Sequence, residues 1–226
     1  KFQNIYGNRE GELGSWGSLM DTPSNFDPSD FFNTGMTEMN GFTLTTGTEQ
    51  NQTYASVSTT NSTGILPNNA YNRYNFSIRN TAKFCDNKLS LDLGAQYIIQ
   101  NNKNMVGSGQ YFNPLVSLYL FPRGENFQEV QMYERYSEAR NLMVQYWPES
   151  IFGTDLDMQN PYWIMNRMQN ELSKRRYMFN ASLKWDITDW VNVTGRVRVD
   201  NSDSDSYEKY YASTRGTFTE SSSKGY

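Results

Sequence analysis

The chain has 226 residues and a formal net charge of −4, and 15% of its residues are aromatic although only 37% are hydrophobic. Disordered chains share the low hydrophobic content but are poor in aromatic residues, so the composition argues against disorder. The lack of histidine excludes Ser-His-Asp triads and histidine-ligated metals, the single cysteine excludes an internal disulfide, and the slightly acidic balance gives no basic surface for nucleic acid.

The chain begins with an irregular segment and then becomes rich in strand patterns. Residues 1–40 carry many Gly, Pro and Asp residues and predict a long loop with one short helix near 28–32. Four strands are then predicted, two weak and Thr-rich and two with clear alternation of apolar and polar residues: 42–48, 52–60, 74–84 and 89–99.

A long stretch without strand periodicity, residues 101–175, follows these strands. Two more strands with regular alternation are predicted over 177–185 and 191–199, and a further weak strand over 206–218. Because the alternation has a period of two and Asn, Ser, Thr and Tyr are abundant, the chain is predicted to be all-β.

The charged residues of the four clear strands all fall on the polar phase. They are Arg79, Lys83, Asp92, Lys184, Arg196 and Arg198. A Lys or Arg that faces lipid near the bilayer midplane costs roughly 2–4 kcal/mol, so a transmembrane β-barrel would require this sorting. A soluble β-sandwich also places its charges on one face, so the alternation alone leaves both folds open.

The lengths of the connections favour the membrane fold. The turns at 49–52, 85–88 and 187–190 are short, whereas the connections at 61–73 and 101–175 are long, and the two classes alternate along the chain. Consecutive antiparallel strands deliver alternate connections to opposite ends of a sheet. Short turns at one rim and long loops at the other are typical of transmembrane barrels, whereas a compact soluble domain rarely carries so long a loop.

Several stretches resemble the SusC/RagA family of TonB-dependent outer-membrane transporters. They are FFNTG at 31–35, GILPNNAYNRYNFSIRN at 64–80, NPLVSLYLFPRG at 113–124, NPYWIMNR at 160–167 and RRYMFNASLKWDITDWVNVTGRVRVD at 175–200. The likeness covers most of the chain, and the NPYW and LYLFPRG blocks are distinctive in combination. Members that take up starch fragments are the most similar.

The resemblance implies that the chain is part of a large antiparallel transmembrane β-barrel, of about 22 strands in the family. The implied division is as follows: 1–40 an extracellular loop, 41–100 barrel strands, 101–175 a partly helical extracellular loop, and 176–226 strands and a loop. The plug and the segment that contacts TonB are expected before Lys1, and most other strands after Tyr226.

The function implied by the resemblance is TonB-dependent import of oligosaccharides, such as starch-derived maltooligosaccharides, across the outer membrane of a Gram-negative bacterium. A SusD-like surface lipoprotein would act as a lid, and the TonB complex and outer-membrane lipid would be further partners. No enzymatic activity, cofactor, metal or nucleic-acid partner is expected. The alternatives are import of peptides or another glycan, and a soluble cell-surface carbohydrate-binding β domain.

Two sets of residues are candidate contacts under this interpretation. The residues expected to face the barrel lumen are Arg79, Asp92, Lys184, Arg196 and Arg198. The residues expected to contact substrate or partner are Tyr119, Arg123, Trp147, Asn160, Tyr162, Trp163 and Arg167. The aromatic members of the second set could stack on sugar rings or could pack within the loop.

Two further patterns lie in the loops. Residues 129–147 combine apolar and charged residues at helical spacing without Gly or Pro, which predicts a helix within a platform that docks the lipoprotein lid. The acidic stretches 155–157 and 200–206 are spaced like the oxygen ligands of a hard cation, but the Gly and Glu positions of an EF-hand are missing. They are interpreted as solvated loop acids.

Overall fold

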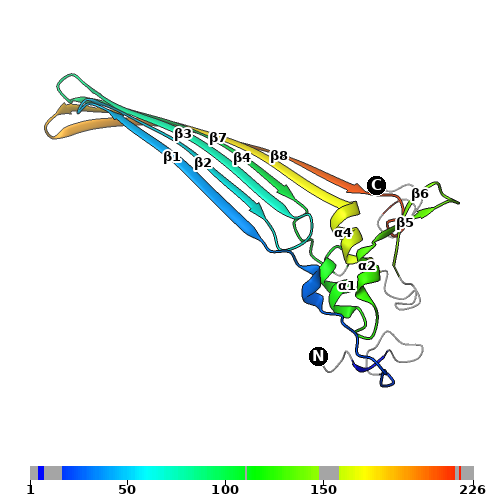
Figure 1. Cartoon of the computed structure of the whole chain (residues 1–226). Coiled ribbons are helices and arrows are strands. Elements are labelled where there is room, and N and C mark those ends of the chain that lie inside the picture. Colours follow the sequence, from blue (N-terminus) through cyan, green and yellow to red (C-terminus); the bar gives the residue numbers. More distant parts are fainter. Residues whose placement is uncertain (1–4, 8–16, 110, 148–157, 217–218, 220–226) are drawn as a thin grey trace.

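The computed structural model describes residues 5–7, 17–109, 111–147, 158–216 and 219. These residues form a long antiparallel sheet and, at one end of it, a folded region of short helices and one hairpin (Figure 1). We call this second region the cap; it comprises 17–35, 64–69, 104–147, 158–167 and 211–216 where described.

The sheet has six strands in the order β1-β2-β3-β4-β7-β8. Their bounds are β1 Met36–Gly47, β2 Asn51–Thr63, β3 Ala70–Phe84, β4 Leu89–Lys103, β7 Met168–Thr188 and β8 Val191–Tyr210. Every neighbouring pair is antiparallel, and the order in the sheet follows the order in the chain. The all-β prediction and all six of the main predicted strands are therefore confirmed.

The strands are longer than predicted, chiefly at the end near the cap. β7 has 21 residues and β8 has 20, whereas strands in globular proteins usually have about 5–6 residues. β8 runs without interruption into 206–210, so the separate strand predicted over 206–218 is wrong. Residues 168–176 and 200–210 carry polar side chains on both faces, which removes the period-two signal although the backbone ladder continues.

The connections between strands sort by length to opposite ends of the sheet, as Figure 1 shows. The three short turns lie at the end remote from the cap, and the connections 64–69 and 104–167 lie at the cap end. In the β3–β4 turn, Cys85, Asp86 and Asn87 all have positive φ, a left-handed backbone that Asp and Asn tolerate better than most residues. In the β7–β8 turn, the Val191 amide donates to the Thr188 hydroxyl at 3.1 Å.

The described part of the connection between β4 and β7 contains three short helices and a hairpin. The helices are α1 Pro114–Leu120, α2 Phe127–Gln131 and α4 Pro161–Arg167, and the hairpin pairs β5 Glu134–Ser137 with β6 Leu142–Gln145. Each helix begins after an Asn whose side-chain oxygen accepts a hydrogen bond from a backbone amide of the first turn: Asn113, Asn126 and Asn160. Asn is among the most favoured N-cap residues, and Pro at the first helical position suits α1 and α4.

The helix predicted over 129–147 is wrong. Only its first residues belong to α2, and the rest form the β5–β6 hairpin. Asn141 has a φ of 51° in the hairpin turn, and its side chain accepts a hydrogen bond from the Tyr136 hydroxyl at 2.6 Å. The expected short helix near 28–32 is present as the 3-10 helix η2 Pro28–Phe31, which Asp27 caps.

No helix among the described residues is long and apolar enough to cross a bilayer.

Candidate functional site

One face of the sheet carries an apolar belt that spans all six strands. A single cross-strand row of this belt contains Leu44, Ala55, Ile78, Ala95, Phe179 and Val199. The next row contains Val57 and four aromatic residues: Phe42, Phe76, Tyr97 and Tyr177. Many of these side chains are exposed, with Phe42 at 69% and Val197, one row away, at 62%. Soluble monomers rarely leave so extended an apolar surface in water.

The height of the belt matches the apolar layer of a membrane. On β4 it runs from Leu89 to Ile99, which is about 33 Å along a strand at roughly 3.3 Å per residue. A strand tilted by about 40° would project this length onto about 25 Å, the height of the apolar band on outer-membrane barrels. Aromatic residues lie near both limits of the belt.

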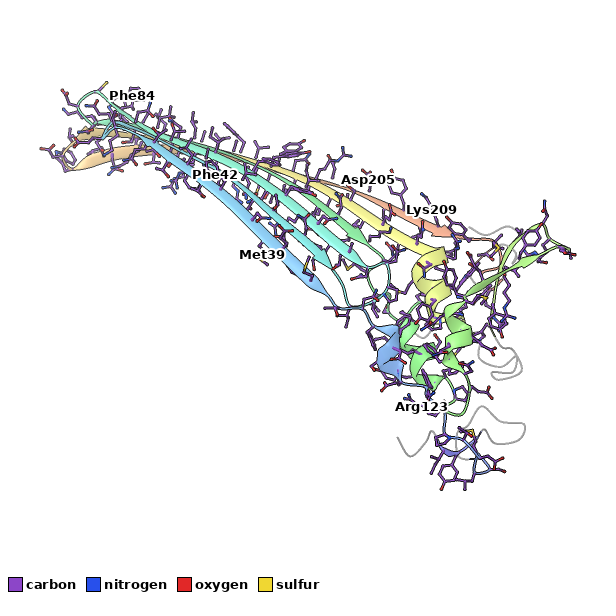
Figure 2. The ribbon with its side chains drawn as sticks, viewed as in Figure 1. Met39, Phe42, Phe84, Arg123, Asp205 and Lys209 are labelled. Carbon is purple, nitrogen blue, oxygen red and sulfur yellow. The ribbon has the colours of Figure 1, made fainter. Side chains whose placement is uncertain are left out.

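The aromatic residues at the limits of the belt include Phe84, Trp185 and Trp190 toward the short turns and Tyr74, Tyr97 and Tyr177 toward the cap. Figure 2 shows Phe84 at the turn end of the sheet. Trp190, in the β7–β8 turn, is one of the most exposed large side chains among the described residues. Aromatic rings at these two levels are typical of proteins that cross a membrane as strands.

The opposite face of the sheet is polar and charged. Register places all five residues predicted for the lumen on this face: Arg79, Asp92, Lys184, Arg196 and Arg198. Several of its charges are paired, with Arg79 bound to Asp92, Arg176 to Asp200 at 2.6 Å and Lys184 to Asp186 at 2.9 Å. The two faces therefore differ sharply in polarity.

A groove of about 700 Å³ lies on the polar face between Tyr54, Arg79, Asn180 and Arg198. Gly94 lies at its floor, and a Cβ atom at this position would come within 2.5 Å of the Asn180 side-chain oxygen. The glycine therefore leaves room for the Asn180 amide across the strand pair.

Beyond the belt, toward the cap, the outer ends of β7 and β8 carry charges on both faces. Arg175 and Asp205 form an ion pair of 3.0 Å on the face that continues the belt, whereas Arg176 and Asp200 lie on the polar face. Figure 2 shows Asp205 and Lys209 on this part of β8. The belt therefore ends well before the strands do, so the sheet projects beyond its own apolar zone at the cap end only.

The cap has a hydrophobic core of its own. Its buried cluster joins side chains from segments far apart in the chain: Phe26, Phe31, Leu66, Leu118, Phe121, Phe127, Val130, Trp147, Met158 and Met165. The rings of Phe26, Phe121 and Phe127 pack in a triangle with centroids 4.5–5.3 Å apart. The described parts of the long connections therefore form a packed domain.

Three residues predicted to contact substrate or partner belong to the interior of the cap. Trp147 is part of the core cluster, and Trp163 is fully buried with its ring N–H donating to the Thr214 hydroxyl at 3.1 Å. Asn160 is also fully buried. All three side chains pack inside the cap, which for the two tryptophans is the second of the two roles considered from the sequence. Their contact with substrate or partner stays a prediction.

Asn160 fixes the position of the hairpin as well as the start of α4. Its side-chain nitrogen donates to the carbonyl oxygens of Val130 and Tyr146 at 2.8 and 2.9 Å, while its side-chain oxygen accepts from the Tyr162 amide at 2.8 Å. Its backbone amide donates to the Gln145 side-chain oxygen at 2.9 Å. One buried carboxamide thus joins α2, the hairpin and α4.

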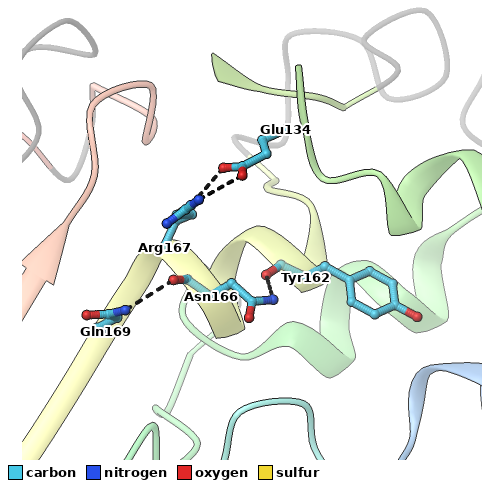
Figure 3. Close-up of polar contacts among 5 residues, drawn as sticks. All are labelled: Glu134, Tyr162, Asn166, Arg167 and Gln169. Atoms are coloured by element: carbon cyan, nitrogen blue, oxygen red, sulfur yellow. Dashed lines mark hydrogen bonds and ion pairs between the residues drawn. The ribbon is translucent and has the colours of Figure 1, made fainter. Parts of the chain in front are cut away.

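Arg167 ties the hairpin to the end of the sheet. Its guanidinium donates two hydrogen bonds of 2.7 Å to the Glu134 carboxylate, as Figure 3 shows, and it lies 4.8 Å from the centroid of the Tyr211 ring. The hydrogen bonds to Glu134 raise the pKa of Arg167 above its usual value. The Tyr211 amide donates to the Arg167 carbonyl, which connects this pair to the segment after β8.

The remaining predicted contact residues lie nearer the surface. Tyr162 is half-buried, packs edge-on against Phe31 with ring centroids 4.8 Å apart, and burial raises its pKa. Its backbone carbonyl accepts from the Asn166 side chain, shown in Figure 3. Tyr119 is largely exposed on α1, and Arg123 stacks over the Phe26 ring at 4.8 Å.

Sequence reasoning missed the polar residues that hold the cap together: Glu134, Gln145, Gln159, Ser213 and Thr214. Gln145 and Gln159 each join the hairpin or α4 to the segment after β8, for example through the Arg215 amide, which donates to the Gln159 side chain at 3.1 Å. No local pattern in the sequence distinguishes these residues from exposed polar ones, because each has a partner 33 or more positions away in the chain.

No group of three Asp, Glu or Cys side chains suited to hold a metal ion occurs within the described part of the chain. The acidic residues of 200–206 lie in β8, where Asp200 is on the polar face and Asp203 and Asp205 are on the other. Because Asp200 points to the face opposite Asp203 and Asp205, the three carboxylates cannot share one cation. The acidic stretch 155–157 lies outside the described residues.

Comparison with models of known protein families gave no match to this chain, and a search of curated proteins gave no significant match.

Proposed function

We propose that the sheet is a sector of an outer-membrane β-barrel and that the cap is its extracellular domain. The apolar belt carries this proposal, because it puts large exposed side chains in a zone about 25 Å high on one face only. The charged opposite face would then line a hydrated lumen. The alternation of short turns and folded connections supports the same orientation.

The two edge strands fit this proposal. Among the described residues β1 and β8 each have one neighbour in the sheet. Unpaired backbone groups are prohibitively costly in lipid, so the barrel would be closed by further strands beyond those of this sheet.

The transport activity rests on the resemblance to the SusC/RagA family. We propose TonB-dependent import of oligosaccharides, such as starch-derived maltooligosaccharides, with a SusD-like lipoprotein as lid. Import of peptides or of another glycan is the alternative within transport. A soluble carbohydrate-binding domain is disfavoured because it would leave the belt in water.

The cap offers a surface for the lipoprotein at its hairpin. Tyr136 and Met143 face each other across the β5–β6 ladder and are both exposed, and Met132, just before the hairpin, is exposed as well. Tyr and Met are enriched in protein interfaces. We expect Tyr136→Ser together with Met143→Ser to reduce co-purification of the lipoprotein without loss of barrel assembly. Unchanged co-purification would rule out the hairpin as the docking surface.

The membrane proposal is tested by fractionation and sidedness in the full-length protein. After expression in a Gram-negative host, the protein should sediment with outer membranes and require detergent for extraction. In a Cys85→Ser background, single cysteines placed at Ser108 or Glu138 in the cap should react with an impermeant thiol reagent on intact cells. Cysteines at Asn87 or Asp189 in the short turns should react only after lysis. A protein soluble in buffer, or the reverse labelling pattern, would refute the proposal.

A further inference from the structure

A cavity of about 400 Å³ lies where the polar face of β7 and β8 meets the cap. Its strand residues are the cross-strand pairs Met168–Tyr210 and Asn170–Glu208, which have the same phase as Asp200 and Arg198. The cavity therefore opens on the polar face that the proposed barrel would turn toward its lumen, at the cap end of that face.

One wall of the cavity is fixed in place by the buried residue Asn104. Its side-chain nitrogen donates to the carbonyl oxygens of Asn68 and Met165 at 3.0 and 2.9 Å. Its side-chain oxygen accepts from the Asn170 amide at 3.0 Å, and its own amide donates to the Asn170 carbonyl at 2.7 Å. These four hydrogen bonds fix the point from which residues 105–108 continue along the cavity.

The lining combines an apolar surface with a few polar groups. Met105 and Val106 present exposed aliphatic surface, and the Phe112 and Tyr210 rings pack with centroids 6.0 Å apart. Ser108, Asn170 and Glu208 supply a hydroxyl, a carboxamide and a carboxylate, and the Tyr210 hydroxyl donates to Glu208 at 3.2 Å. No Lys or Arg is among the described residues that line this cavity.

This chemistry points to a neutral polyhydroxylated ligand. A sugar ring has C–H faces that pack on apolar and aromatic side chains, and hydroxyls that donate to a carboxylate or an amide oxygen. An anionic ligand would meet the Glu208 carboxylate without a compensating cation, and a purely apolar one would leave buried polar groups unpaired. The volume lies within the usual range of about 300–1,000 Å³ for small-molecule sites.

We propose that this cavity binds one sugar unit of the transported oligosaccharide, at the mouth of the lumen. The proposal rests on the proposed transport function and adds to it a specific subsite. Asn170 and Glu208 would hold hydroxyl groups of the sugar, Tyr210 and Val106 would contact its ring, and Asn104 would keep the wall in position.

The test compares two tryptophan substitutions at exposed aliphatic residues in the full-length protein. Val106→Trp should fill the cavity, whereas Ile65→Trp lies outside its lining; both positions are about half exposed, so neither disturbs the core of the cap. Titration calorimetry in detergent would measure the Kd for maltohexaose, cellohexaose and an inulin oligosaccharide. For the oligosaccharide that binds, we expect Val106→Trp to raise the Kd at least tenfold and Asn170→Ala to raise it about threefold to tenfold. Ile65→Trp should raise the Kd less than twofold.

The outcomes separate the two proposals. If the wild-type protein binds one of the oligosaccharides and Val106→Trp binds it equally well, the subsite is refuted and the transport function stands. If the wild-type protein binds none of them, the subsite is refuted together with import of these oligosaccharides, and import of peptides or of another glycan takes their place. Equal weakening by Ile65→Trp would show that the effect is not specific to the cavity and would also refute the subsite.

Discussion

The sheet and the cap place their apolar side chains in opposite positions. In the cap, Phe31 and Leu118 are completely buried by residues of the cap itself, whereas on the sheet the rings and branched chains of the belt stay exposed. The cap is therefore stabilised by a hydrophobic core of its own. The belt of the sheet has no such cover among the described residues. Under the proposed function, a lipid bilayer would supply the apolar medium against which the belt packs.

Polar interactions show the same difference between the two regions. The Arg175–Asp205 pair on the sheet is about half exposed at both ends, but the Arg167–Glu134 pair of the cap is mostly enclosed and lies beside Tyr211. Exposed pairs contribute about 0–1 kcal/mol, while breaking an enclosed one leaves a charge without its partner. Polar groups in the cap thus fix its segments relative to one another. On the sheet they mainly make one face hydrophilic.

The largest effect is expected when the belt loses its apolar character. Val197→Arg puts a charge in the middle rows of the belt, where it should cost about 2–4 kcal/mol and prevent outer-membrane assembly. Thr194→Arg, three residues away on the polar face, is the matched control and should assemble normally. Heat-modifiable migration of the full-length protein on gels would measure folding. Equal assembly of the two variants would mean that the faces are assigned wrongly.

The core of the cap provides the second test. Leu118→Ala removes a side chain with 0% exposure and should destabilise the cap by about 2–5 kcal/mol. Leu120→Ala, in the same helix at 49% exposure, should cost less than about 1 kcal/mol. Limited proteolysis of the protein in membranes should cut the cap of the first variant while the strands stay protected. Cleavage of the strands at the same rate would show that the two regions do not have separate sources of stability.

A smaller effect is expected from the ion pairs. Arg167→Met leaves the Glu134 carboxylate without its two hydrogen bonds and should destabilise the cap by about 1–3 kcal/mol. Arg175→Met breaks an exposed pair and should change stability by less than about 1 kcal/mol. Hydrogen exchange of the hairpin amides would detect the first change. If both substitutions increased exchange equally, the enclosed pair would have no special role in holding the hairpin.

The sheet could be predicted from the sequence because its information is local. Apolar and polar residues alternate at Leu89–Ile99 and in the strands that follow 176, which identifies these segments as strands and assigns each side chain to a face. The short turns then determine which residues pair across neighbouring strands. The outer ends of β7 and β8 were missed because Lys174, Arg175 and Arg176 place charge on both faces. Pairing continues there without any hydrophobic pattern to reveal it.

The cap could be predicted only in part because the contacts that determine its structure join residues far apart in the chain. The Asn-Pro pairs at 113–114 and 160–161 are start signals from which α1 and α4 could have been located. The hairpin could not, because the residues of 129–147 suit a helix locally, and it is Asn160 and Arg167 that fix them as strands. The burial of Trp163 likewise depends on Thr214, which follows the last strand.

The most direct test of the membrane assignment is a residue-by-residue accessibility scan along β8 in the full-length protein. With Cys85→Ser as background, single cysteines at six positions of β8 would each carry an environment-sensitive fluorophore: Val193, Thr194, Arg196, Val197, Arg198 and Val199. Membrane-embedded protein is then exposed to a lipid-borne quencher and to an aqueous one. The lipid quencher should act on 193, 197 and 199, and the aqueous quencher on 194, 196 and 198. Quenching without a period of two, or aqueous quenching of the three valine positions, would contradict a lipid-facing belt.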